Sequence, residues 1–89
     1  MDEFAFFPHL KVLALKSNQI DSLDKLPVLN ELEDLDLAEN QISSGLSKLK
    51  NVPNIKALNL DGVNMNDLNQ FPELKKLEGL DLARNAVTD

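Results

Sequence analysis

The stretch LEDLDLAENQI, residues 32–42, combines two patterns that decide the fold of this chain. Leu35 and Leu37 alternate with aspartates, as in a short strand that buries one of its faces. Asn40 and Ile42 follow, where such a strand turns away from its sheet. Segments of the same form begin at residues 10, 32, 55 and 77, with spacings of 22, 23 and 22 residues. Because the segments agree in phase, they predict about four repeats of one structural unit.

Between these segments, apolar residues recur at every third position, as in Leu23, Leu26 and Leu29, a spacing that suits 3-10 turns. Prolines at 27, 53 and 72 oppose long α-helices there. The unit is that of leucine-rich repeats. We therefore predict an α/β leucine-rich repeat solenoid, with a short parallel sheet on the concave face and 3-10 turns on the convex face. The strands should begin near residues 12, 34, 57 and 79. The leucines expected in the core are Leu13, Leu15, Leu35, Leu37, Leu58, Leu60, Leu80 and Leu82.

Three asparagines, Asn18, Asn40 and Asn85, recur where the strands end. An amide there can donate to and accept from loop backbone groups that would otherwise be buried without partners. Their recurrence with the repeat favours this structural role over ligand binding. Val63 interrupts the series, so the third turn must satisfy its backbone differently, and Asn64 beside it is the candidate substitute.

Residues 1–89 are predicted to form a single leucine-rich repeat domain that is incomplete at both ends. The every-third-residue pattern continues backwards from Leu10 to Met1, so the first unit should lack its strand. No capping unit is visible at either end. We therefore expect apolar surface at the Phe4–Phe7 region and at the Val87 edge, and self-association through these uncapped ends.

The charge of the chain narrows the choice of partners. There are 15 acidic and 9 basic residues, a formal net charge of −6, and no cysteine. An acidic domain is repelled by phosphate, which argues against nucleic acid and anionic membranes as partners. The chain also shows neither a long apolar run nor the basic start of a signal peptide. We expect an intracellular, soluble protein whose partners are proteins with basic segments.

The third, fifth and seventh positions of each strand segment should face solvent on the concave side. Four aspartates and one lysine occupy these positions, and Lys16 and Arg84 mark the edges with the opposite sign. This strip fits a docking site for a basic segment, and it equally fits an ordinary solvated acidic face. The predicted protein-binding residues are Lys16, Asp34, Asp36, Asn59, Asp61, Asp81 and Arg84.

No residue pattern predicts catalysis, a cofactor or a metal. Asp34 and Asp36 would lie on an open sheet, without a pocket that could raise the pKa of one carboxyl group. His9 is the only histidine and has no cysteine with which to form a zinc site. We therefore expect a protein that is not an enzyme.

Three stretches, Leu26–Leu46, Val52–Leu60 and Leu74–Asp89, carry a family resemblance. They resemble the acidic leucine-rich nuclear phosphoproteins, and the Ser44-Gly45-Leu46 step is the most specific piece. The resemblance implies an adaptor without enzymatic activity, found in nucleus and cytoplasm, that binds histones and chromatin factors and inhibits protein phosphatase 2A. The chain departs from the family in lacking both caps and the acidic tail, which puts tail-dependent histone and nuclear roles in doubt, and in having Val63 for the expected Asn.

Two alternatives to this adaptor remain. The type-1 phosphatase-regulatory leucine-rich repeat proteins use the same 22-residue unit, so the chain also resembles a phosphatase-regulatory protein. The other alternative is an uncapped structural fragment that self-associates.

Overall fold

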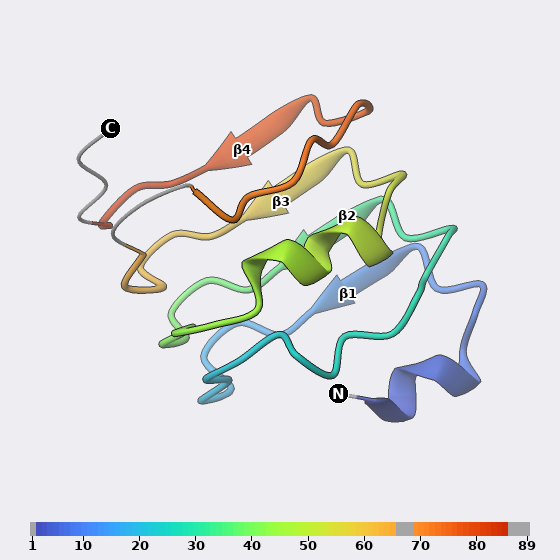
Figure 1. Cartoon of the computed structure of the whole chain (residues 1–89), viewed down its shortest axis with the longest axis horizontal. Coiled ribbons are helices and arrows are strands. Elements are labelled where there is room, and N and C mark those ends of the chain that lie inside the picture. Colours follow the sequence, from blue (N-terminus) through green and yellow to red (C-terminus); the bar gives the residue numbers. More distant parts are fainter. Residues whose placement is uncertain (1, 66–68, 86–89) are drawn as a thin grey trace.

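The computed structural model describes residues 2–65 and 69–85 of the chain. Within these residues, short strands alternate with turns, and two 3-10 helices occur (Figure 1). The elements in chain order are η1 (Asp2–Phe6), β1 (Val12–Ala14), β2 (Asp34–Asp36), η2 (Leu46–Asn51), β3 (Ala57–Asn59) and β4 (Gly79–Asp81).

The strands form one parallel sheet in the order β1-β2-β3-β4 (Figure 1). Each residue pairs with its equivalent in the next repeat, so that Leu13 lies beside Leu35, Leu35 beside Leu58 and Leu58 beside Leu80. The four predicted strand starts are confirmed. This in-register pairing follows from the repeat spacing, because each unit returns the chain to the same height along the sheet.

The middle residue of β1, β2 and β3 is buried in the core, while its neighbours lie on the opposite face. We call this second face, which carries residues 12, 14, 34, 36, 57, 59, 79 and 81, the open face. The predicted burial is confirmed for five leucines, which are Leu13, Leu35, Leu37, Leu58 and Leu60. Leu15 and Leu82 are only half-buried, and the prediction is wrong for Leu80, which is 41% exposed. Leu80 lies on β4, which within residues 2–65 and 69–85 pairs with β3 alone.

The segments between the strands complete the core. Leu23, Leu26, Leu29 and Leu32 are all buried, as the spacing of three predicts. In this segment the spacing produces separate turns, in which Leu26 N donates to Leu23 O at 3.0 Å and Leu32 N donates to Leu29 O at 3.3 Å. Within the described residues, continuous 3-10 helix forms only at η1 and at η2, where Leu49 is buried. Figure 1 shows η2 and neighbouring connecting segments lying over one face of the sheet.

The N-terminal aromatic residues behave differently from one another. Phe4 is half-buried and packs against the core, whereas Phe6 and Phe7 are 82% and 57% exposed. The expected apolar surface near Phe4–Phe7 is therefore carried by Phe6 and Phe7. The expected exposure at Val87 concerns a position outside the described residues.

The repeated asparagines hold consecutive turns together, as the sequence predicts. Asn40 is 1% exposed, and its Oδ1 accepts from Asn18 N at 3.0 Å and Ile20 N at 2.8 Å. Its Nδ2 donates to Leu15 O at 3.0 Å and to Leu37 O at 2.9 Å. Asn85 repeats this arrangement two repeats further on, accepting from Val63 N and Met65 N and donating to Leu60 O.

Where Val63 interrupts the asparagine series, the main chain supplies the missing acceptor. Ile42 N donates to Val63 O at 3.1 Å. The expectation that Asn64 substitutes for the missing amide is wrong, because the Asn64 side chain forms no hydrogen bond within the described residues and is exposed.

Candidate protein-binding surface

The strand register places the predicted binding residues in rows across the open face. Asp36, Asn59 and Asp81 are paired neighbours and form one row. Asp34 lies in the adjacent row, beside Ala57, which in turn pairs with Gly79. The remaining predicted residues, Lys16, Asp61 and Arg84, lie in the turns that follow the strands.

The row Asp36–Asn59–Asp81 also has a structural role. Each Oδ1 accepts a hydrogen bond from the backbone N–H two residues ahead: Ala38 N at 3.0 Å, Asp61 N at 2.9 Å and Ala83 N at 2.9 Å. Asp and Asn commonly form this local turn, because a short side chain with an oxygen acceptor reaches its own backbone. Each Asp is thereby held at the end of its strand, while its second oxygen forms no hydrogen bond within the described residues. Sequence reasoning missed this role, although the recurrence of Asp or Asn at one repeat position was its signal.

Arg84 links three of the turns through its guanidinium group. Nε donates to Asp61 Oδ1 at 2.8 Å, and Nη2 donates to Asp61 Oδ2 at 3.0 Å and to Glu39 Oε2 at 3.2 Å. The other Glu39 oxygen, Oε1, accepts from Ser17 Oγ at 2.7 Å, and Lys16 Nζ lies 3.8 Å from Glu39 Oε2. We call these five residues the turn-edge network.

This network changes the predicted role of the two basic residues. Lys16 and Arg84 were expected to mark opposite edges of the strip, but the structure joins them through Glu39, which sequence reasoning did not select. Arg84 and Glu39 are 45 residues apart, so only the stacking of the repeats brings them together. The available signal was the shared repeat position of Ser17, Glu39 and Arg84.

The pKa values follow these contacts. The pKa of Glu39 is lowered, first by the hydrogen bond from Ser17, then by that from Arg84 and by the charge of Lys16. The hydrogen bonds from Arg84 lower the pKa of Asp61, and they raise the pKa of Arg84 in return. Asp61 is therefore already neutralised by a partner within the chain. The predicted carboxylates that remain without an ion pair in the described residues are Asp34, Asp36 and Asp81.

Two of these carboxylates, Asp34 and Asp81, line a shallow depression of about 490 Å³ on the open face, over β3 and β4. Its floor contains the small residues Ala57 and Gly79 together with the exposed edge of Leu80. A β-carbon built on Gly79 would meet no atom within 4 Å, so the backbone is open to close approach there. The arrangement offers acidic groups at the rim and accessible apolar and backbone surface between them.

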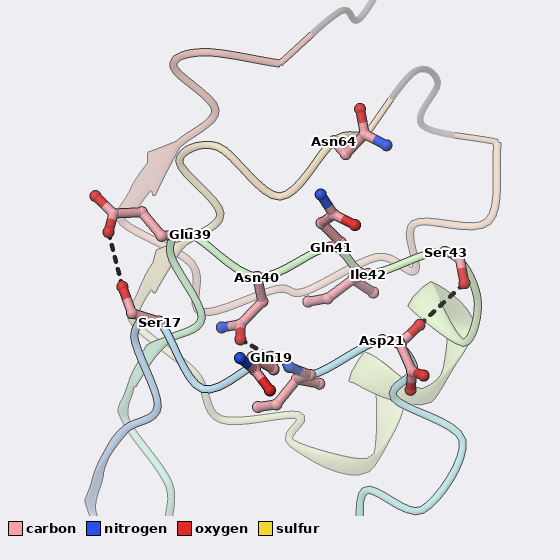
Figure 2. A pocket seen from close by; sticks show the side chains of 10 residues that line it. Ser17, Gln19, Asp21, Glu39, Asn40, Gln41, Ile42, Ser43 and Asn64 are labelled. Atoms are coloured by element: carbon pink, nitrogen blue, oxygen red, sulfur yellow. Dashed lines mark hydrogen bonds between the residues drawn. The ribbon is translucent and has the colours of Figure 1, made fainter.

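A second depression, of about 510 Å³, lies in the turns beyond the strand ends and was not predicted (Figure 2). Gln19, Gln41 and Asn64 line it from three successive turns, at equivalent repeat positions. Several of its other polar groups already have partners: Ser17 donates to Glu39, and Ser43 Oγ donates to Asp21 O at 3.0 Å (Figure 2). The charged residues that line this depression are Asp21 and Glu39. Glu39 is already paired within the turn-edge network, so the exposed Asp21 is the one carboxylate here without an ion pair in the described residues.

The structure gives no support for metal binding or a membrane span in its described residues. His9 hydrogen-bonds to Glu31 through Nδ1 at an exposed position. Within residues 2–65 and 69–85, no group of three or more His, Asp or Glu side chains is placed to hold a metal ion. In the same residues, no helix is long and apolar enough to cross a membrane.

Comparison with known proteins identifies one similarity. A family model described as Leucine Rich repeat matches residues 8–23, the part of the chain that contains β1 and the turn after it. No curated protein and no solved structure matches the chain. The match and the short parallel sheet together fit an α/β fold of the leucine-rich repeat type, and repeats of this kind indicate a protein-interaction module.

Proposed function

We propose that this chain is a non-enzymatic protein-interaction module that binds an extended basic segment of a partner across its open face. In this proposal the repeats form a curved solenoid, so that the open face is its concave surface. The observation that carries the proposal is the row Asp36–Asn59–Asp81, which holds two carboxylates in fixed orientation with a neutral amide between them.

The geometry of this row suits a peptide. Neighbouring strands lie roughly 4.8 Å apart, so Asp36 and Asp81 are separated by about 9.6 Å. An extended chain with two lysines or arginines can span that distance. Because Asp61 is paired with Arg84, the attraction should come from Asp34, Asp36 and Asp81 rather than from the whole predicted strip.

The family resemblance suggests which basic segments to test first. It favours an adaptor that binds histones or chromatin factors, inhibits protein phosphatase 2A and occurs in nucleus and cytoplasm. A basic peptide of the histone-tail type is therefore the appropriate probe, and protein phosphatase 2A is the second. If the chain is instead a phosphatase-regulatory protein, the open face should bind a phosphatase and not the basic peptide.

The proposal is tested by titrating the basic peptide against the wild type and the Asp36→Asn/Asp81→Asn variant. Asparagine preserves the acceptor for the backbone, as Asn59 already does in the same row, so the fold should be retained. We expect roughly 10- to 100-fold weaker binding for the variant, and binding that weakens steadily as salt is added.

The matched control is Asp24→Asn/Glu73→Gln, which removes the same formal charge at exposed positions away from the open face. It should bind almost as tightly as the wild type. Equal affinity of the wild type and Asp36→Asn/Asp81→Asn, with circular dichroism showing both folded, would remove the open face from the account.

A further inference from the structure

The turn after β3 contains a pair of residues whose backbone is chemically reactive. Asp61 is followed by Gly62, the only Asp-Gly pair in the sequence, and no asparagine precedes a glycine. In such a pair, the backbone nitrogen of the second residue can attack the side-chain carboxyl carbon of the first. Glycine favours this attack, because it has no side chain to crowd the nitrogen and it leaves the backbone flexible. Asp61–Gly62 is therefore the aspartyl bond of this chain with the greatest intrinsic reactivity.

The reaction needs no reagent other than water. Attack of Gly62 N on Asp61 Cγ forms a C–N bond, and the carboxyl hydroxyl leaves with the amide proton as water. The cyclic succinimide that results is then opened by water at either of its two carbonyl carbons. Opening at Cγ restores aspartate. Opening at the main-chain carbonyl carbon gives isoaspartate, in which the chain runs through Cβ and Cγ and the α-carboxylate is free.

The fold restrains the peptide group that supplies the attacking nitrogen. Gly62 N donates to Ala83 O at 2.9 Å, and Glu39 N donates to Asp61 O at 2.8 Å. These two hydrogen bonds connect the Asp61–Gly62 peptide group to the turns on both sides. Any rotation of this peptide plane breaks both bonds, so the nitrogen is not free to move toward Cγ while the turns stay stacked.

Arg84 restrains the carboxyl group that would be attacked. Its Nε donates to Asp61 Oδ1 at 2.8 Å and its Nη2 donates to Oδ2 at 3.0 Å. A β-carbon built on Gly62 would lie 3.7–3.9 Å from Nη2, Cζ and Nε of Arg84, so the guanidinium group lies against the open side of the glycine. These hydrogen bonds also lower the pKa of Asp61. An ionised carboxylate loses an oxygen far less readily than the neutral acid, so Arg84 opposes the reaction through both position and charge.

The restraint by Arg84 can be released without unfolding. The side chain of Asp61 is 22% exposed and that of Arg84 is 63% exposed. Exposed ion pairs are weak and are screened by salt, so the guanidinium group can leave Asp61 while the repeats remain stacked. Water, which must open the succinimide, also has access to this turn.

We propose that Asp61 is a site of isoaspartate formation and that Arg84 controls the rate of this modification. Conversion would turn the Asp61 carbonyl group, which accepts from Glu39 N, into a free carboxylate. It would also lengthen the main chain by a methylene group and displace Gly62 from Ala83 O. The modified turn would lose its hydrogen bonds to the turns on both sides. The proposal is independent of peptide docking, because it uses none of the carboxylates assigned to that function.

Timed peptide mapping of the folded wild type and of Arg84→Gln, near neutral pH, tests the proposal. An isoaspartyl peptide keeps its mass but changes its retention time, and fragmentation in the mass spectrometer identifies the residue. Arg84→Gln should form isoaspartate at residue 61 roughly two- to fivefold faster than the wild type, as expected for the loss of an exposed ion pair. The exposed Asp21–Ser22 bond is the internal reference, because Asp21 has no ion pair within the described residues. Its rate should be the same in both proteins.

Two further variants and a denatured sample separate the contact with Asp61 from other effects. Lys75→Gln removes the same charge as Arg84→Gln and should keep the wild-type rate at Asp61. Glu39→Gln disrupts the turn-edge network but leaves both hydrogen bonds between Arg84 and Asp61 in place, so its rate should stay within about twofold of wild type. In urea all four proteins should react at a common rate, at least roughly tenfold faster than the folded wild type. Circular dichroism would confirm that the variants are folded before incubation.

Three results would overturn the proposal. The first is a folded Arg84→Gln variant that forms isoaspartate at residue 61 no faster than the wild type. The second is equal acceleration by Glu39→Gln and Arg84→Gln, since general loosening of the turns would then explain the effect. The third is a folded wild type that reacts at residue 61 as fast as the chain in urea, because neither the guanidinium group nor the backbone hydrogen bonds would then restrain the bond.

Discussion

Leu58 and Leu80 occupy the same position in neighbouring strands and lie directly beside each other in the sheet, yet their environments differ sharply. Leu58 is 2% exposed and Leu80 is 41% exposed. Leu58 lies on β3, which pairs with a strand on each side, whereas β4 pairs with one strand in the part of the chain that the structure describes. The segment that precedes β4 is also looser, since Phe71, Leu74 and Leu77 are only partly buried, while Leu23, Leu29 and Leu32 are fully buried. Stability in this chain is therefore concentrated in the interior repeats, although the motif is the same throughout.

Replacing each of the two leucines by alanine should give the largest difference in the free energy of unfolding. Leu58→Ala is expected to lower the free energy of unfolding by about 2–5 kcal/mol, because it leaves a cavity between repeats. Leu80→Ala should cost less than about 1 kcal/mol, because its side chain already contacts solvent. Urea unfolding of both variants measures the difference. Should Leu58→Ala fail to fold, Leu58→Val and Leu80→Val must show the same order, and equal losses would refute the contrast.

The asparagine series provides the next contrast. Asn40→Ala should cost about 2–3 kcal/mol, because it leaves the part-buried N–H groups of Asn18 and Ile20 and the Leu15 carbonyl without their partner. Asn18→Ala removes a single exposed hydrogen bond to Lys16 O and should cost less than about 0.5 kcal/mol. Thermal and urea unfolding at low protein concentration compare the two. A loss for Asn18→Ala as large as that for Asn40→Ala would contradict this interpretation.

Two glycines extend the comparison to the backbone. Gly45 has φ +90°, and a β-carbon there would lie 2.8–2.9 Å from Asp24 and Leu23 atoms. Gly45→Ala should therefore destabilise the chain by about 1–3 kcal/mol. Gly79 has open space around it, and Gly79→Ala should be neutral or stabilise by up to about 1 kcal/mol through the unfolded chain. A large loss at Gly79 would show that β4 is more tightly surrounded than its exposure indicates.

The strands and most of the core could be predicted because the repeat encodes both. A spacing of 22 or 23 residues fixes which side chains become neighbours, so Leu13, Leu35 and Leu58 were identified correctly without any knowledge of packing. The predicted burial of Leu80 was wrong, because the burial of a strand residue depends on neighbours outside its own repeat. The spacing of three predicted which side chains enter the core, but not which segments wind into continuous 3-10 helix rather than separate turns.

The candidate site was harder to predict than the fold. The rows of the open face followed from the alternation, but the ion pair of Arg84 with Asp61 depends on how the long Arg84 side chain reaches across to the neighbouring turn. Glu39 was missed for the same reason. The turn-forming role of Asp36 and Asp81 follows from general residue chemistry and was recognisable in the sequence.

The smallest expected effect concerns the pH dependence of stability, and it tests whether the turn-edge network connects the repeats in solution. The pKa of Asp61 lies below its ordinary value of 3.8 because of hydrogen bonds from Arg84, and that of Glu39 lies below its ordinary value of 4.5. A carboxylate with a lowered pKa in the folded state stabilises the fold at pH values above its ordinary pKa, and this contribution is lost as the pH falls through the lowered pKa.

Arg84→Gln should return the pKa of Asp61 toward its ordinary value, whereas Glu39 keeps the hydrogen bond from Ser17. Its urea midpoint should therefore fall less steeply than that of wild type as the pH drops below about 4.5. Lys75→Gln removes the same charge at an exposed position without an ion pair in the described part of the chain, and it should retain the wild-type slope. If both variants kept that slope, the contacts of Arg84 would contribute nothing measurable to the stability of the stacked turns.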